Sequence, residues 1–240
     1  MRISQADIEA NIPALQRVIR ALTRYQREEL AEWILNSGDF DTVVAEAGRD
    51  WSAPAERHPL TLEEFLALEA GTSVRHEYID GEIFEMRAPM PRHEVIVTNL
   101  LSRLRAQVSA GQTTVITSSL GVHLRVEERD LFYRPDVVVA ACALADLDVP
   151  YISEPRMIVE VFSPVTEDID RREKWLNYRR IAGLETYLLV AQRSPQVIVF
   201  EPGSDWRPVE LTALDAVVES HSLALSVSLR ELYAGTSLRF

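Results

Sequence analysis

Two acidic residues lie in apolar segments of the chain, and their positions favour a cation-binding pair. Asp136 follows Pro135 at the start of the run VVVAA, and Glu160 lies inside MIVEVF. An isolated carboxylate in a buried strand costs several kcal/mol unless a proton, an arginine or a metal ion compensates its charge. Only one loop separates the two segments, so they can pair as neighbouring strands with both carboxylates at one sheet edge. Oxygen ligands of this kind suit Mg²⁺ or Mn²⁺.

Each of these acids also has a purely structural interpretation. Asp136 could be a turn residue after Pro135, or it could form an ion pair with Arg134. Glu160 could form an internal salt bridge with an arginine. The two acids taken together, with the lysine that follows them, favour the cation-binding interpretation.

Lys174 is the only lysine among the 25 lysine and arginine residues of the chain. Asp170, Lys174 and Tyr178 are spaced four residues apart, so they share one face of a predicted helix. This helix begins shortly after Glu160 and is expected to cover the same strand end, with the ammonium group directed toward Asp136 and Glu160. An ammonium is a compact group that can lose its proton, unlike a guanidinium. The alternative is a surface Asp–Lys pair with a tyrosine packed beside it.

The pattern of apolar residues divides the chain into two regions. Residues 1–56 have apolar positions at helical spacing and predict an all-helical extension, for which we expect a role in oligomerisation. Residues 57–240 alternate between helical and strand patterns and predict an α/β domain. Its short strands with continuous apolar runs indicate a central mixed sheet covered by helices on both sides.

Composition and charge narrow the classes of protein to be considered. The 240 residues carry a net charge of −12, so binding to nucleic acid requires a local basic groove or metal ions. A single cysteine excludes an internal disulfide framework. No apolar run is long enough to span a bilayer, and the first residues do not form a secretion signal. These features predict a cytoplasmic protein that does not enter membranes.

The order of motifs in residues 58–235 resembles the Uma-two family of restriction endonucleases, which belongs to the PD-(D/E)XK nuclease superfamily. The resemblance rests on RHEYIDGEI, a following histidine, YRPDVVV, IVEVFSP and the spaced residues of D…K…Y…G..E.YLLV. It implies a restriction-endonuclease-like core in which Pro135-Asp136 is the PD motif and Glu160 the second acid. The superfamily lysine usually stands two residues after that acid, at Phe162, and here it corresponds to Lys174 on the next helix.

The resemblance implies a Mg²⁺- or Mn²⁺-dependent endonuclease that hydrolyses DNA phosphodiester bonds with a metal-activated water. Asp136, Glu160 and the main-chain carbonyl of Val161 would hold the metal, and Lys174 would orient the water and stabilise developing negative charge. The family pattern also marks Glu77 in the hairpin motif. This residue is either a further metal ligand or an anchor for the lysine, and its alternative is a solvent-facing hairpin residue.

Three further residues are candidates for contact with substrate. His93 is a candidate phosphate contact, with the alternative of a polar residue at a helix start. Tyr178 is expected to pack against the site or hydrogen-bond to it, and Arg171 belongs to a group of arginines that could bind the DNA backbone: Arg92, Arg103, Arg105, Arg171, Arg172, Arg179 and Arg180. Two other functions stay open. One is a non-catalytic nuclease-fold protein that assembles through its N-terminal helices, for which we expect a homodimer, and the other is a phosphoesterase acting on RNA or another phosphate ester.

Overall fold

The computed structural model describes residues 59–86, 89–107, 113–141, 150–163, 169–223 and 225–238. From Leu60 onward these residues belong to one compact unit. The predicted helical extension, residues 1–56, lies outside the described residues, so its structure and its boundary with the α/β domain remain predictions. None of the helices in the described ranges has both the length and the hydropathy needed to cross a bilayer.

The described part of the chain opens with a capped helix and a tight hairpin. Helix α4 (Leu62–Ala70) starts at Thr61, whose side chain accepts the N–H of Glu64 while the Glu64 carboxylate accepts the N–H of Thr61. Strands β1 (His76–Ile79) and β2 (Glu82–Glu85) pair in antiparallel register across the Asp80-Gly81 turn. Both turn residues have positive φ, 50° and 94°, which explains the Asp-Gly sequence.

A five-stranded sheet has the order β2-β1-β5-β4-β7. Its remaining strands are β4 (Gly121–Val126), β5 (Arg129–Tyr133) and β7 (Tyr151–Ile152). On one face of this sheet, Phe65 of α4 stacks against Tyr78 and packs edge-on against Phe132. The other face, which carries Leu131 and Tyr133, joins the apolar core of a second sheet.

The second sheet has six strands in the order β11-β10-β9-β8-β6-β3. Their bounds are β3 (Thr114–Thr117), β6 (Val137–Ala140), β8 (Pro155–Phe162), β9 (Thr186–Ala191), β10 (Val197–Phe200) and β11 (Val209–Leu211). Strands β8 and β9 are parallel and the other neighbours are antiparallel, so the sheet is mixed. The predicted mixed α/β fold is therefore confirmed for the described residues.

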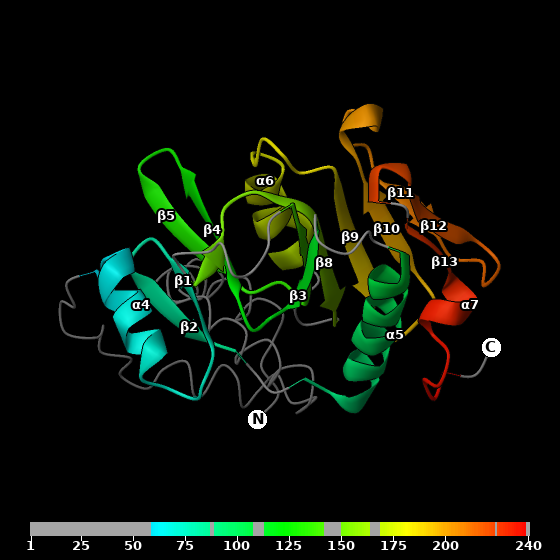
Figure 1. Cartoon of the computed structure of the whole chain (residues 1–240), viewed down its shortest axis with the longest axis horizontal. Coiled ribbons are helices and arrows are strands. Elements are labelled where there is room, and N and C mark those ends of the chain that lie inside the picture. Colours follow the sequence, from blue (N-terminus) through cyan, green and yellow to red (C-terminus); the bar gives the residue numbers. More distant parts are fainter. Residues whose placement is uncertain are drawn as a thin grey trace, which may run out of the picture. The chain divides into compact units, whose positions relative to one another are not determined.

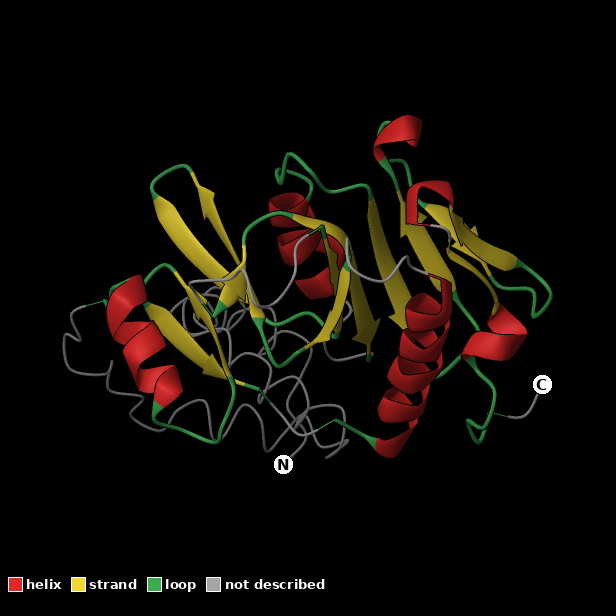
Figure 2. Cartoon of the chain, in the orientation of Figure 1, coloured by secondary structure: helices red, strands yellow, loops and turns green. Residues whose placement is uncertain are grey.

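Both faces of the six-stranded sheet are covered. Helix α5 (Pro91–Gln107), helix α7 (Leu229–Leu232) and the hairpin of β12 (Val217–Ser220) and β13 (Leu225–Ser228) pack on one face (Figure 1). The π-helix η2 (Ile169–Lys174), helix α6 (Trp175–Tyr178) and the five-stranded sheet pack on the other. Figure 2 shows the short η2–α6 helix between the strands of the two sheets. Two 3₁₀ turns, η3 (Pro202–Ser204) and η4 (His221–Leu223), lie near the C-terminal strands.

Two elements differ from the sequence-based expectation. The apolar pattern of residues 113–126 predicts one strand, but a turn at Ser118 and Ser119 divides it into β3 and β4, which join different sheets. The sequence also predicts a single α-helix from about Thr166 to Ala182, whereas the described part begins as a π-helix at Ile169 and is α-helical only over Trp175–Tyr178. Short π-helical segments are frequent at functional sites.

Candidate active site

The pairing of β6 with β8 places the two predicted acids side by side. Val137 lies opposite Val159 in the antiparallel register, so one further step places Asp136 opposite Glu160. Directly opposed residues of antiparallel strands project from the same sheet face. That face carries the apolar core shared with η2–α6, because Ile158 and Phe162 of β8 pack there.

Asp136 is held at the end of the β6–β8 ladder. Its Oδ2 accepts the main-chain N–H of Val161 at 2.6 Å, and its Oδ1 lies 3.0 Å from His93 Nε2. In a strand, the N–H and C=O groups of one residue point to the same side. The Val161 carbonyl therefore points toward Asp136 as well, which puts a third oxygen near the two carboxylates.

Lys174 joins the acids of the two sheets. Its ammonium lies 3.0 Å from Glu160 Oε1 on β8 and 2.8 Å from Glu77 Oε1 on β1. Asp170 Oδ1, one turn earlier on the π-helix, is 3.5 Å away. All four side chains are no more than 7 % exposed. The alternatives of a surface Asp–Lys pair and of a solvent-facing Glu77 are therefore wrong.

Tyr178 donates a second hydrogen bond to the Glu160 carboxylate. Its hydroxyl is 3.1 Å from Oε1, the same oxygen that accepts from Lys174. The ring is fixed by edge contacts with Tyr133 and Tyr187. Both hydrogen bonds described for the Glu160 side chain fall on Oε1, so Oε2 is the oxygen that we consider for contact with a ligand.

The acid–lysine cluster, which consists of Lys174, Glu77, Asp136, Glu160 and Asp170, contains more negative than positive charge. Burial raises the pKa of Glu160 well above its usual value; Lys174 opposes this shift, and the charges of Asp170, Asp136 and Glu77 add to it. Burial also raises the pKa of Tyr178, and the Glu160 charge adds to this effect, so the tyrosine acts as a hydrogen-bond donor at neutral pH. Because several buried carboxylates share one ammonium, the cluster keeps a net negative charge. A bound proton or cation can neutralise it.

His93, in the first turn of α5, faces Asp136. Burial lowers its pKa, but the hydrogen bond and charge of Asp136 outweigh this effect, and the net pKa is raised. Its Nδ1 is buried without a hydrogen-bond partner in the described structure, and Glu94 is 3.7 Å away. His93 is thus both a residue at a helix start and a direct contact of the acid pair.

The candidate DNA-binding arginines are dispersed. The Arg171 guanidinium lies over the ring of Phe162, 5.3 Å from its centroid, next to the acid-bearing end of β8. Arg179 lies over Trp175 in a similar way. On α5, Arg103 pairs with Glu231, and Arg92 donates to Ser237. Of this group, Arg171 has the best-defined position near the acids.

Two residues belong to the site in ways that the sequence did not predict. Asp170 had a usable signal, since its four-residue spacing to Lys174 was visible, but only its burial shows that it belongs to the cluster. Arg134 was considered as an ion-pair partner of Asp136, and this is wrong. Its guanidinium binds Glu69, while its main-chain N–H donates to Glu77 Oε1 at 3.1 Å.

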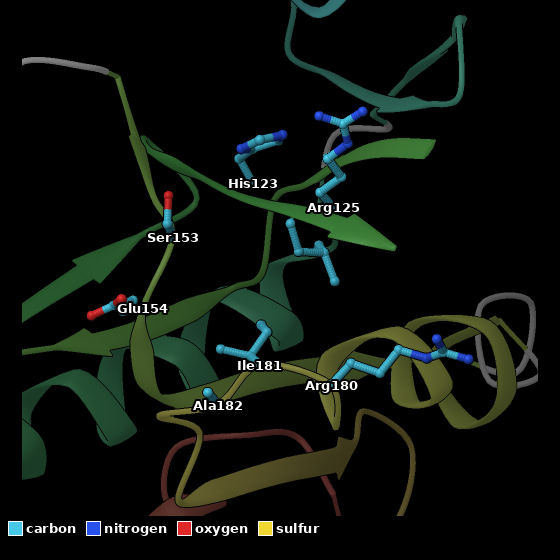
Figure 3. Close-up of a pocket in the computed structure, with 8 residues that line it drawn as sticks. His123, Arg125, Ser153, Glu154, Arg180, Ile181 and Ala182 are labelled. Carbon is cyan, nitrogen blue, oxygen red and sulfur yellow. The ribbon is translucent and has the colours of Figure 1, made fainter. Parts of the chain in front are cut away.

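Other conspicuous groups lie away from the acid pair. Glu185, which the family pattern marks, forms a two-point ion pair with Arg156 near the start of β8, at the opposite end of the strand from Glu160. A pocket of about 360 Å³ lies at that end as well, between β4 and the turn after α6 (Figure 3). Ile181 projects into it, and Arg125 and Arg180 extend from its two opposite walls. Arg180 is one of the candidate DNA-binding arginines, but the predicted acids, Lys174, Tyr178 and His93 do not line this pocket.

Replacing Glu160 with glutamine is expected to stabilise the metal-free fold. Because the folded-state pKa of Glu160 is raised above 4.5, the folded protein holds a proton that the unfolded chain releases as pH rises. The free energy of unfolding therefore falls as pH increases from about 4.5 toward the raised pKa. The glutamine amide does not titrate, so the variant does not show this fall. We expect thermal unfolding in EDTA to give a Tm about 2–4 °C higher at pH 8, about 1 kcal/mol, and no difference near pH 4.

Glu185→Gln is the matched control, with the opposite expected sign. Burial opposes ionisation of Glu185, but its hydrogen bonds to Arg156 and Ser222 and the Arg156 charge lower its pKa. The ionised Glu185 carboxylate stabilises the fold above pH 4.5, and this stabilisation is lost as pH falls through the lowered pKa. Replacing it with an amide should therefore lower Tm at pH 8. A lower Tm for Glu160→Gln at pH 8 would contradict this expectation, because it would show that Lys174 already compensates the negative charge of the buried carboxylates.

Comparison with protein families identifies a match over most of the chain. The profile described as "Uma2: Putative restriction endonuclease" matches residues 62–231. Two proteins of Synechocystis sp. (strain ATCC 27184 / PCC 6803 / Kazusa) are similar in sequence. The uncharacterized protein slr1290 is 30 % identical over 186 residues, 77 % of this chain and 95 % of that protein. The uncharacterized protein sll1609 is 28 % identical over 164 residues, 67 % and 92 % of the two chains.

A solved structure shares the fold. It is the crystal structure of a protein from Anabaena variabilis described as "a putative nuclease belonging to DUF820", which superimposes with a TM-score of 0.60. The alignment covers 73 % of this chain and 98 % of the other, at 22 % sequence identity. At this identity the likeness identifies the restriction-endonuclease-like fold and does not extend to the reaction.

Proposed function

The chain belongs to the Uma2 family of restriction-endonuclease-like proteins, and on this premise we propose that it is a metal-dependent endonuclease that hydrolyses phosphodiester bonds in DNA. One observation carries the proposal. Asp136 and Glu160 lie on adjoining strands, and a buried lysine from the following helix reaches the second acid. Acid pairs with an adjacent lysine suit phosphoryl chemistry, because they can bind a cation and stabilise negative charge at one point.

The residues present fit a divalent cation. Asp136, the Oε2 atom of Glu160 and the Val161 carbonyl are hard oxygen ligands of the kind that Mg²⁺ and Mn²⁺ prefer. Within the described ranges, no three acidic, histidine or cysteine side chains form a metal site by themselves, so water and substrate oxygens would complete the coordination. When bound, the cation would polarise the scissile phosphate and lower the pKa of a coordinated water.

The residues of the chain have separate parts in this proposal. Lys174 would compensate the negative charge that develops on the phosphate. Glu77 and Asp170 contact the same ammonium at 2.8 and 3.5 Å and help to hold it in place. Tyr178 orients the Glu160 carboxylate by its hydrogen bond to Oε1, which leaves Oε2 for the cation.

The substrate would approach the outer side of the acid pair. Asp136 is the most accessible member, with 15 % of its side chain exposed, and His93 is equally exposed beside it. The partly exposed imidazole of His93 and the guanidinium of Arg171 are the groups we assign to phosphate contact. Because the whole chain has a net charge of −12, weak binding to DNA is expected without a divalent cation.

A plasmid cleavage assay with metal titration tests the proposal. Purified full-length protein should convert supercoiled DNA to nicked or linear forms in Mg²⁺ or Mn²⁺, and EDTA should stop the reaction. Single-stranded DNA and RNA in parallel reactions distinguish the substrate classes. Cleavage of RNA alone would replace the DNA proposal with an RNA phosphoesterase, and no cleavage of any nucleic acid under these metals would contradict a nuclease function.

A further inference from the structure

Arg134 is a buried guanidinium that stands two residues before Asp136. Only 4 % of its side chain is exposed, and it lies in the short connection between β5 and β6. An arginine is rarely buried to this degree unless its charge is paired and its donors are satisfied. The contacts of Arg134 therefore indicate what the guanidinium holds in place.

The guanidinium joins three separate segments of the fold. Its Nη2 donates to Glu69 Oε2 of α4 at 2.6 Å, and Glu69 Oε1 also lies 2.5 Å from His76 Nδ1. Its Nε donates to the main-chain carbonyl of His76 on β1 at 3.0 Å. Its Nη1 donates to the carbonyls of Ser118 and Ser119, in the turn between β3 and β4, at 3.1 and 3.2 Å. A planar fork of donors suits this set of partners, whereas a lysine would reach only part of it.

The main chain of the same residue contacts the acid cluster. The Arg134 N–H donates to Glu77 Oε1, the oxygen that lies 2.8 Å from Lys174 Nζ. The side chain thus fixes the carbonyl of His76, and the main chain fixes the carboxylate of the next residue. Through Pro135, which restricts the backbone, the same segment leads directly to Asp136.

We infer that Arg134, charge-paired with Glu69, is a positioning residue that holds Glu77 and Asp136 in register around Lys174. The expected effect of Arg134 on cleavage rests on the proposed function. Its effect on the positions of the acid–lysine cluster does not depend on that function. Displacement of the β5–β6 connection would move Glu77 and Asp136 relative to Lys174. Partners that orient metal ligands in this way typically change affinity or activity by about 10- to 100-fold when they are replaced.

The single lysine of the chain allows a direct measurement. Full-length protein labelled with ¹³Cε-lysine contains one labelled side chain, Lys174, so its NMR signal reports the cluster without assignment work. A role confined to stability would lower Tm and leave this signal and the affinity for Mn²⁺ unchanged. A positioning role would shift the signal and weaken Mn²⁺ binding in a protein that is still folded.

The test variant is Glu69→Gln/Arg134→Met, which removes both charges of the buried pair and introduces no lysine. Removal of both partners is tolerated much better than removal of one. The matched control is Glu185→Gln/Arg156→Met, which removes the Arg–Glu pair at the far end of β8. If the test variant shows no cooperative unfolding, the single variant Glu69→Gln replaces it in the same measurements. Its glutamine keeps a hydrogen-bond acceptor for the Arg134 guanidinium.

We expect the test variant to shift the Lys174 signal, to weaken Mn²⁺ binding and to cleave DNA about 10- to 100-fold more slowly, while the control retains all three properties. A folded test variant with the wild-type Lys174 signal would overturn the inference. If the wild-type protein cleaves no nucleic acid, the proposed function fails, and the Lys174 signal still decides whether Arg134 positions the cluster.

Discussion

Substitution of Lys174 by methionine is expected to lower the cleavage rate by about 100- to 1,000-fold, because it removes the ammonium that lies 3.0 Å from Glu160 of the acid pair. The same change is expected to destabilise the fold by about 3–5 kcal/mol, since it removes the shared partner of buried Glu77, Glu160 and Asp170. The loss of stability should be smaller at pH 5 than at pH 8, because carboxylates left without a cation take up protons as pH falls. Cleavage assays and thermal unfolding at both pH values measure the two effects.

Arg125→Met controls for the removal of a positive charge. Arg125 lies on β4 and pairs with Glu128, and 60 % of its side chain is exposed. Partly exposed pairs contribute at most about 1 kcal/mol, so this variant should keep both its cleavage rate and its Tm. Near-wild-type cleavage by a folded Lys174→Met protein would remove the lysine from the proposed reaction.

Asp136→Asn is expected to reduce cleavage by at least about 1,000-fold, about 4 kcal/mol of transition-state stabilisation. The amide has the same shape as the carboxylate, and its oxygen can still accept the N–H of Val161. The negative charge that would bind a cation is lost, so the effect should fall on metal-dependent activity and leave Tm nearly unchanged. Initial cleavage rates across a range of Mg²⁺ concentrations measure the loss.

Asp130→Asn provides a closely matched comparison. Asp130 lies 2.8 Å from His123 Nε2, an Asp–His pair like that of Asp136 and His93 but located on the β4–β5 hairpin. We expect this variant to cleave at the wild-type rate. Equal losses in both variants would mean that the amide acts through general stability, and cleavage by Asp136→Asn at the wild-type rate would exclude Asp136 as a metal ligand.

Features set by short stretches of sequence were predictable. The Asp80-Gly81 turn, the Thr61 cap and the pairing of the segments that carry Asp136 and Glu160 all follow from local turn chemistry and apolar runs. The convergence of Lys174 on Glu160 also followed, because a helix after β8 must lie over the sheet face that β8 presents. These inferences needed no knowledge of contacts between distant segments.

The remaining features depend on such contacts. Whether Glu77 faces solvent or the core depends on which face of the five-stranded sheet packs against η2–α6, and the hairpin sequence does not determine this. The Glu69–Arg134 pair joins residues 65 positions apart. The local sequence around Arg134 is equally compatible with an ion pair to Asp136, so it does not predict Glu69 as the partner. The π-helix was not predictable because its residues also have an ordinary α-helical pattern.

Titration of the full-length protein with Mn²⁺, followed by the electron paramagnetic resonance signal of the free ion, tests the central claim that Asp136 and Glu160 share a cation. The account predicts saturable binding by the wild-type protein and by Asp130→Asn, and loss of that binding in both Asp136→Asn and Glu160→Gln. No saturable binding by the wild-type protein, or unchanged binding in the two variants of the acid pair, would contradict it.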